Sequence, residues 1–304
     1  PTKDLLDGDI NMQTDLTYQG VEYRKKISLP GIEMEFVDAN HMLGSAQIGL
    51  IIDNLDYTVG YSGDIGPNVE NTIDVDVLFL DPSHSTFFDN RQYSRADAFI
   101  ELAQEVNKYV QSGESFNIIA GSGLLQLILH KLATSENMPL IWDKIPAVIG
   151  GSEDYTPKRA NRLKRFCNVY KNWGYFQPEV LSKKDLKDED RIRDLELSNQ
   201  CVKIFSDIAD AQNSFSYSFN CELRPNKKEP ISPFSNGRGV HVSLSAHETG
   251  DTLRQYIEKV SPKLVITDGH RNNNHDKAKE LSGHIKNKMG IESITSLELN
   301  ERNS

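Results

Sequence analysis

The chain has 304 residues, of which 38% are hydrophobic and 26% charged, and it carries a formal net charge of −10 at pH 7. This composition predicts a soluble globular protein of one large or two ordinary domains, and no apolar run approaches the roughly 20 residues that a membrane span needs. The negative charge disfavours a broad nucleic-acid-coating surface, but a local basic groove is compatible with it. Three cysteines without a C-x-x-C pair favour a reduced, cytoplasmic setting: Cys167, Cys201 and Cys221.

Residues 21–82 are predicted to form a series of short strands. Each segment is either alternating or continuously apolar over a few residues, and each is broken by Gly, Asn or Asp. The segments are VEYRKKISLP, IEMEFVDAN, QIGLIIDN, YTVGYSGD and VDVLFLDPS. The chain therefore starts with a region rich in β-structure.

A helix is predicted over residues 94–112, with Ser94 as the N-cap and apolar residues at helical spacing. Residues 116–133 (FNIIAGSGLLQLILHKLA) are typical of a strand, a glycine turn and a helix, which is the rhythm of an α/β layer. The middle of the chain, 151–235, is more polar, and its charge run at 183–196 is typical of a solvated face or loop. From residue 238 a strand, a helix, a strand and a last helix are predicted: RGVHVSLSAH, DTLRQYIEKV, KLVITDGH and DKAKELSGHIKNKM.

Two polar residues follow strands in the first region. His41 comes after the strand that ends in FVDAN, and Asp64 comes after YTVGYSG. Loops at strand ends gather polar side chains over a rigid sheet, and imidazole and carboxylate are ligands that zinc favours in catalytic sites. Either residue alone is explained by an ordinary turn, but the two together indicate a metal site.

Four motifs occur in a fixed order along the chain: HMLGSAQ, YSGDIG, LFLDPSHS and SLSAHETGDTLRQYI. In this order they resemble the metallo-β-lactamase nucleases that carry a β-CASP insertion, a family that includes RNase J, the 3′-end-processing endonuclease and DNA-repair nucleases. HMLGSAQ resembles the third metal motif of that family, with Asn40 in place of the usual glycine. PTKDLL at the start of the chain and FNIIAGSGLLQLIL also resemble family segments, so the resemblance runs nearly end to end.

The resemblance implies a role for each of five residues. His41 is expected to bind one zinc ion, and Asp64 in YSGDIG to bridge two. Asp81 matches motif A and His247 matches motif B, so His247 is expected to donate to a phosphate oxygen or to the leaving group, with Asp81 orienting it. The motif C position falls on Gly269, and Asp268 is the group expected nearest the metal, with His270 as the alternative.

The fold class that follows is α/β. A metallo-β-lactamase-like αββα sandwich, incomplete at its N-terminus, is expected from residues 1–92 and 238–304, with an inserted α/β β-CASP domain at 93–237. The family's main metal signature, H-x-H-x-D-H, does not occur in the 304 residues. The resemblance therefore implies that a preceding segment carries most ligands of the two zinc ions, and that the chain as given binds zinc weakly and is inactive.

The function expected of the complete protein is zinc-dependent cleavage of RNA, because two Zn²⁺ ions activate a water for attack on a phosphodiester. Three alternatives remain open: a non-catalytic scaffold subunit of an RNA-processing complex, a DNA-repair nuclease, and a single-metal or non-nucleolytic hydrolase on the same fold. A homodimer or processing-complex subunits, and endonuclease or exonuclease action, also stay open. Cations expected to contact nucleic acid are those of PKRANRLKR and its continuation: Arg159, Arg162, Lys164, Arg165 and Lys171.

Overall fold

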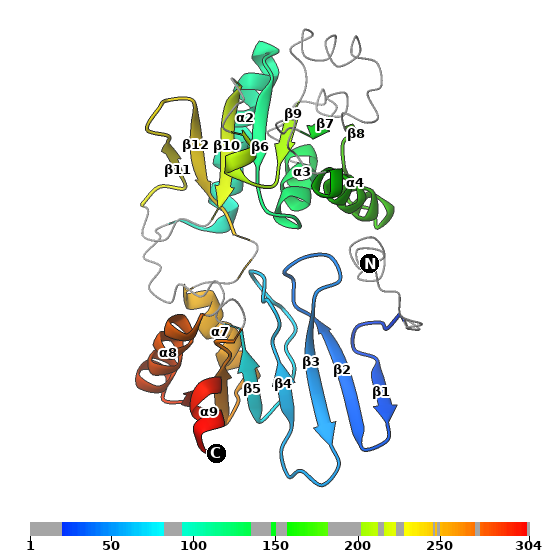
Figure 1. The fold of residues 1–304 in the computed structure, drawn as a ribbon, viewed down its shortest axis with the longest axis vertical. Coiled ribbons are helices and arrows are strands. Elements are labelled where there is room, and N and C mark those ends of the chain that lie inside the picture. The colour runs from blue at the N-terminus through cyan, green and yellow to red at the C-terminus, as the bar shows by residue number, and fades with distance from the viewer. Residues whose placement is uncertain are drawn as a thin grey trace. The chain divides into compact units, whose positions relative to one another are not determined.

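The computed structural model describes residues 20–81, 93–134, 147–149, 157–181, 202–211, 216–222, 228–245, 247, 250–270 and 274–302. In this part of the chain the structure is mixed α/β, as predicted, with two seven-stranded sheets and their helices (Figure 1). The PTKDLL segment and the charge run at 183–196 lie outside the described residues.

The chain divides into two compact units. The outer unit comprises residues 15–89 and 246–304, and the central unit comprises residues 90–245 together with 1–14. Each unit contains one of the two sheets. The assignment of the parts to a metallo-β-lactamase-like domain and a β-CASP domain stays a prediction.

The sheet of the outer unit has the order β1-β2-β3-β4-β5-β13-β14. The pairs β1–β2, β2–β3 and β3–β4 are antiparallel, whereas β4, β5, β13 and β14 are parallel to one another. The carboxyl ends of β4, β5 and β13 therefore meet at one edge of the sheet. The strands are β1 (Lys26–Leu29), β2 (Ile32–Asp38), β3 (Ala46–Ile52), β4 (Val59–Tyr61), β5 (Val77–Leu80), β13 (Leu264–Thr267) and β14 (Glu292–Thr295).

One face of this sheet packs into a hydrophobic core. The helices of the unit are α7 (Gly250–Val260), α8 (His275–His284), continued by a π-helical segment at Ile285–Met289, and α9 (Ser296–Arg302). Apolar side chains of α7 and α8 join the core-facing side chains of β2, β5 and β13. The buried members include Val37, Leu78, Leu80, Leu253, Tyr256, Ile257, Val260, Val265 and Leu281.

The opposite face of β1–β5 is apolar as well, but none of its side chains reaches full burial. Because alternate residues of a strand point to opposite faces, the strand register groups these side chains on one side. All are half-buried except Leu29, which is 51% exposed. The group is Ile27, Leu29, Ile32, Met34, Phe36, Ile48, Leu50, Ile52, Val59, Tyr61, Val77 and Phe79.

The sheet of the central unit has the order β11-β12-β10-β6-β9-β7-β8 and is parallel except for β11. Its strands are β6 (Phe116–Ile119), β7 (Ala147–Ile149), β8 (Val180–Leu181), β9 (Val202–Phe205), β10 (Tyr217–Glu222), β11 (Ile231–Pro233) and β12 (Gly239–Ser243). Its helices are α2 (Arg95–Ser112), α3 (Leu124–Thr134), α4 (Pro157–Asn172) and the short α6 (Ile208–Ala211). Parallel strands with continuous apolar runs are typical of a sheet buried on both faces.

The helix boundaries follow the local sequence signals. Ser94 caps α2 as predicted, because its Oγ accepts a hydrogen bond from Asp97 N–H while the Asp97 carboxylate accepts one from Ser94 N–H. Gly113, in the left-handed region with φ +72°, ends this helix. Among the described helices, none combines the length and the apolar character that a transmembrane span requires.

Candidate metal centre

The loop between β2 and β3 presents His41, and Ser45 holds the shape of that loop. Ser45 Oγ accepts hydrogen bonds from the backbone N–H groups of His41 at 3.1 Å and Met42 at 3.2 Å. Ser45 N–H in turn donates to Met42 O at 2.9 Å. Gly44 has φ +83°, a conformation that glycine adopts without strain. The residues after His41 therefore form a tight turn that keeps the imidazole at the end of β2.

The loop that follows β4 packs directly on the His41 loop. Gly66 N–H donates to Ala39 O at 2.8 Å. A Cβ atom at Gly66 would lie 1.8 Å from Asn40 O, so only glycine permits the two backbones to approach this closely. The glycine after Asp64 in YSGDIG thus explains how the carboxylate and His41 come to share one site.

Asp64 lies beyond the carboxyl end of β4, where the neighbouring parallel strands also end. Ser62 N–H donates to a β5 carbonyl at 2.9 Å, and Ser62 Oγ accepts from Asp81 N–H at 3.2 Å. Asp268 N–H donates to the last carbonyl of β5 at 3.0 Å. The segments that carry Asp64, Asp81 and Asp268 therefore leave the sheet side by side at one edge.

His247 precedes α7, and a buried polar contact fixes that helix on the sheet. Tyr256 OH donates to Gln47 Oε1 at 3.0 Å, and Gln47 Nε2 donates to Asp38 O at 2.8 Å. Burial raises the pKa of the Tyr256 phenol, so the hydroxyl keeps its proton for this bond. The helix that directly follows His247 is therefore anchored to the sheet.

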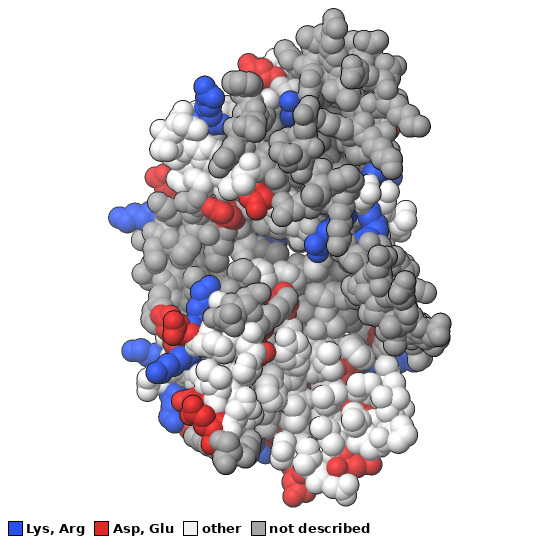
Figure 2. Space-filling model, in the orientation of Figure 1, with Lys and Arg blue, Asp and Glu red and all other residues white. Residues whose placement is uncertain are grey.

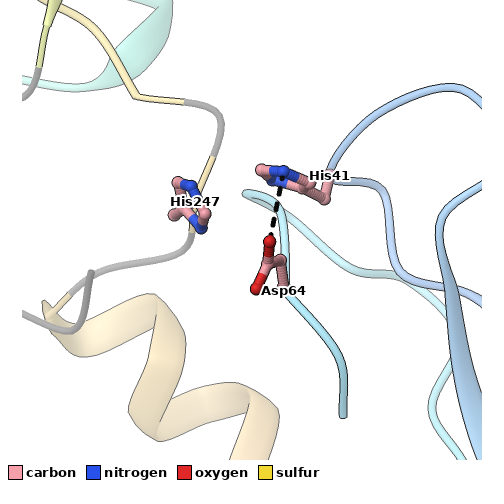
Figure 3. Close-up of side chains that lie close together, drawn as sticks. All are labelled: His41, Asp64 and His247. Atoms are coloured by element: carbon pink, nitrogen blue, oxygen red, sulfur yellow. Dashed lines mark ion pairs between the residues drawn. The ribbon is translucent and has the colours of Figure 1, made fainter. Parts of the chain in front are cut away.

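His41, Asp64 and His247 converge in the outer unit (Figure 3). His41 Nε2 lies 3.7 Å from Asp64 Oδ2, and the ring centroids of His41 and His247 are 4.2 Å apart. One ligand atom from each of the three lies within 4.8 Å of the others, and all three residues are half-buried. Imidazole and carboxylate are ligand types found in catalytic zinc sites, and His41 and Asp64 supply one of each; His247 lies close enough to act as a third ligand or on a group bound beside them. The donor set and the spacing fit a transition-metal ion such as Zn²⁺.

Two other predicted site residues do not belong to this group in the part of the chain described. Asp268 Oδ1 accepts hydrogen bonds from His270 N–H at 3.0 Å and from Ser296 Oγ at 3.3 Å. Asp81 is half-buried at the end of β5, and His270 is exposed. The structure therefore brings together His41, Asp64 and His247, while the roles predicted for Asp81 and Asp268 stay predictions.

Sequence reasoning did not single out the residues that position the site. Gln47 is fully buried, and besides its contact with Tyr256 its amide donates to Asn71 O at 2.9 Å. A glutamine within the apolar run AQIGLII was the available signal, because a buried amide needs several hydrogen-bond partners. No sequence pattern marks Ser45, four residues after His41, because its role rests on two hydrogen bonds that it accepts from backbone N–H groups.

No model of a known protein family matches the chain. A distant relative is the RNase J-like protein of Methanocaldococcus jannaschii, which is 22% identical over 285 residues. The match covers 82% of this chain and 66% of that protein, so the chain spans a little less than two thirds of the length of its relative. The similarity is weak but extends over most of the chain.

Proposed function

We propose that this chain belongs to a zinc-dependent nuclease that cleaves RNA and is built as a metallo-β-lactamase-like sandwich with an inserted β-CASP domain. Residues 1–92 and 238–304 are the lactamase-like part in this proposal, and residues 93–237 are the insertion. Two observations on the sequence support it. Four ordered motifs resemble that family, and the distant similarity to an RNase J-like protein extends over 82% of the chain.

The observation that carries the proposal is the convergence of His41, Asp64 and His247. His41 and His247 are far apart in the sequence, yet their rings lie 4.2 Å apart beside the Asp64 carboxylate. Half-buried imidazoles next to a carboxylate, on loops at the edge of a rigid sheet, are typical of catalytic or metal-binding sites.

In this proposal His41 and Asp64 are metal ligands, and Asp268 or His270 is a further ligand from the same sheet edge. Zinc held by these residues would supply Lewis-acid stabilisation of the negative charge that develops on a phosphodiester during cleavage. Asp64 would contribute the negative charge to such a site, since its carboxylate offers two acceptor oxygens to a cation.

His247 is proposed as the proton donor and not as a ligand. The segment before α7 presents its imidazole to the same space that His41 and Asp64 face (Figure 3). From there it can donate a hydrogen bond to a non-bridging phosphate oxygen or a proton to the leaving oxygen. Asp81, at the end of β5, is proposed to orient the ring.

Single-turnover cleavage of a 5′-labelled RNA and of a DNA with the same sequence tests this function on the complete gene product. We expect metal-dependent cleavage of the RNA, and loss of both bound metal and activity in Asp64→Ala, because without the carboxylate two dications repel each other at short range. Asp53→Ala removes an exposed carboxylate in the turn after β3 and serves as the matched control.

Failure to cleave RNA with added zinc, or full activity of Asp64→Ala, would overturn the proposal. Cleavage of the DNA in preference to the RNA would replace RNA as the substrate by DNA. Tight zinc binding without any cleavage would favour a non-catalytic subunit instead.

A further inference from the structure

Helix α4 of the central unit concentrates positive charge on an acidic protein. Residues 157–178 contain six Lys or Arg residues and no Asp or Glu, whereas the whole chain has a net charge of −10. Lys and Arg side chains gather over α4 in the space-filling view (Figure 2). A segment that departs this far from the charge of its own protein is suited to contact with a polyanion.

Within residues 161–172, where the side chains are described, the outward face of α4 carries only amide and cationic side chains. They recur every three or four residues, so they form one stripe along the helix, and each is exposed or half-buried. The stripe consists of Asn161, Lys164, Arg165, Asn168, Lys171 and Asn172. The opposite face is buried through Leu163, Phe166, Cys167 and Tyr170. All of these side chains carry N–H donors, which are the groups from which a phosphate oxygen accepts hydrogen bonds.

The turn after α4 presents Trp173 on a fixed backbone. Trp173 is 52% exposed, which is unusual for a large aromatic side chain. Phe176 N–H donates to His130 Nδ1 at 2.9 Å, and Gln177 Nε2 donates to Gln126 O at 2.9 Å. Both contacts tie the turn to α3. The backbone that carries the indole is thus anchored directly after Lys171 and Asn172.

We propose that the stripe of α4 together with Trp173 is a surface that holds single-stranded RNA, with the cations and amides on phosphates and the indole stacked on a base. The choice of RNA rests on the proposed function. A membrane-binding helix would need an exposed apolar face, which the stripe does not offer. An acidic peptide would engage the cations but gives the indole no flat partner, whereas every nucleobase does.

Fluorescence anisotropy of a short labelled oligouridylate, measured with EDTA present and over a range of salt concentrations, tests the cationic part. The double variant Lys164→Gln/Lys171→Gln should bind more weakly, and the slope of log K against log[salt] should fall by about 1.4, or about 0.7 for each lost phosphate contact. Lys131→Gln/Lys228→Gln removes two exposed cations elsewhere in the central unit and should leave the slope unchanged. Equal slopes for the two double variants would overturn the proposal.

The indole is tested separately with a base-free competitor. Trp173→Ala should weaken oligouridylate binding by about 5- to 150-fold, whereas Trp173→Phe should retain most of the affinity. Binding of an abasic oligonucleotide should be the same in all three proteins. Equal oligouridylate affinity of Trp173→Ala and wild type would overturn the stacking role.

Binding in EDTA does not depend on the metal centre, so the two proposals fail in different ways. If the α4 variant shows the reduced salt slope but the wild type shows no nuclease activity, this surface is supported and the proposed nuclease function is overturned. If the wild type cleaves RNA and the α4 and Trp173 variants bind RNA as tightly as the wild type, the nuclease function is supported and this surface is overturned.

Discussion

The two sheets of the molecule are covered to different extents. In the central unit all four residues of β6 are buried, and so are four of the six residues of β10. In the outer unit only one of seven residues is buried in β2, and only one of seven in β3. Since consecutive residues of a strand face opposite sides, the central sheet is covered on both faces, and the outer sheet is covered on one by the described residues.

This difference predicts that the central unit is the more self-contained of the two. The central unit covers both faces of its sheet, which favours independent folding. It also exposes the cationic stripe of α4, which is suited to binding a ligand. The outer unit carries the proposed metal site of His41, Asp64 and His247, and it leaves an apolar face of β1–β5 incompletely covered by the described residues. We therefore expect changes to chemistry and changes to stability to divide between the two units.

The largest expected effect is that of His247→Ala on cleavage by the complete gene product. If His247 donates in the transition state and binds no metal, the single-turnover rate should fall by about 10²–10⁴-fold while zinc content and RNA binding stay the same. Metal analysis beside the cleavage assay checks this. Loss of zinc in His247→Ala would make this residue a ligand, and full activity would remove it from the mechanism.

Gly66→Ala should disrupt the outer unit without affecting the central one. The new Cβ would lie 1.8 Å from Asn40 O, so the loops of His41 and Asp64 have to separate, at a cost of at least about 3 kcal/mol in the free energy of unfolding. Gly20→Ala, with open space around its Cβ, is the control. Urea unfolding followed by circular dichroism measures the difference, and an unchanged midpoint in Gly66→Ala would contradict the close approach of the two loops.

The half-covered apolar face should make the outer unit the weaker part of the chain. We expect the chain to bind a hydrophobic dye and to self-associate, and Leu29→Lys to reduce self-association because Leu29 is 51% exposed on that face. Residues 93–237 should fold alone, and limited proteolysis should spare them longest. Digestion that removed the central region first would reverse the comparison between the units.

Part of this architecture was predictable because its signals are local. Alternating strands, the Ser94 cap and the strand–turn–helix at 116–133 each depend on neighbouring residues. β14 and α9 were not predicted, since Glu292–Thr295 is too short for a clear period and the polar helix at Ser296–Arg302 follows it directly. Short elements depend on their tertiary neighbours more than on their own pattern.

The site divides in the same way. The placement of His41 and Asp64 at strand ends followed from the sequence, and Asn40, where the resemblance expects glycine, has φ +50°, which Asn tolerates better than most residues. The approach of His247 to His41 could not be derived from spacing, because it depends on the packing of α7 through Tyr256.

The smallest expected effect concerns a surface ion pair at the base of the outer sheet. The pKa of Asp76 is lowered to about 2. The main cause is the hydrogen bond that Lys263 Nζ donates at 2.7 Å, followed by the hydrogen bonds from Thr58. A carboxyl group with a lowered pKa stabilises the fold above its ordinary value of 3.8, and the stabilisation is lost as the pH falls through about 2.

Asp76→Asn should therefore be slightly less stable than the wild type at pH 7, and the gap should narrow below pH about 4. The effect should be small because the Lys263 side chain is 80% exposed. Thermal unfolding at several pH values measures it. A gap that widened toward acid would contradict the assigned sign.

Zinc titration of the 304-residue chain tests the metal centre most directly, with wild type, His41→Ala, Asp64→Ala and Asp53→Ala compared by calorimetry. We predict weak zinc binding by the wild type and Asp53→Ala. Loss of a residue that only hydrogen-bonds to a metal ligand lowers metal affinity by roughly 10–100-fold. We expect His41→Ala and Asp64→Ala to lower the zinc affinity by more than that. Equal zinc affinity in all four proteins would contradict the assignment of His41 and Asp64 as ligands.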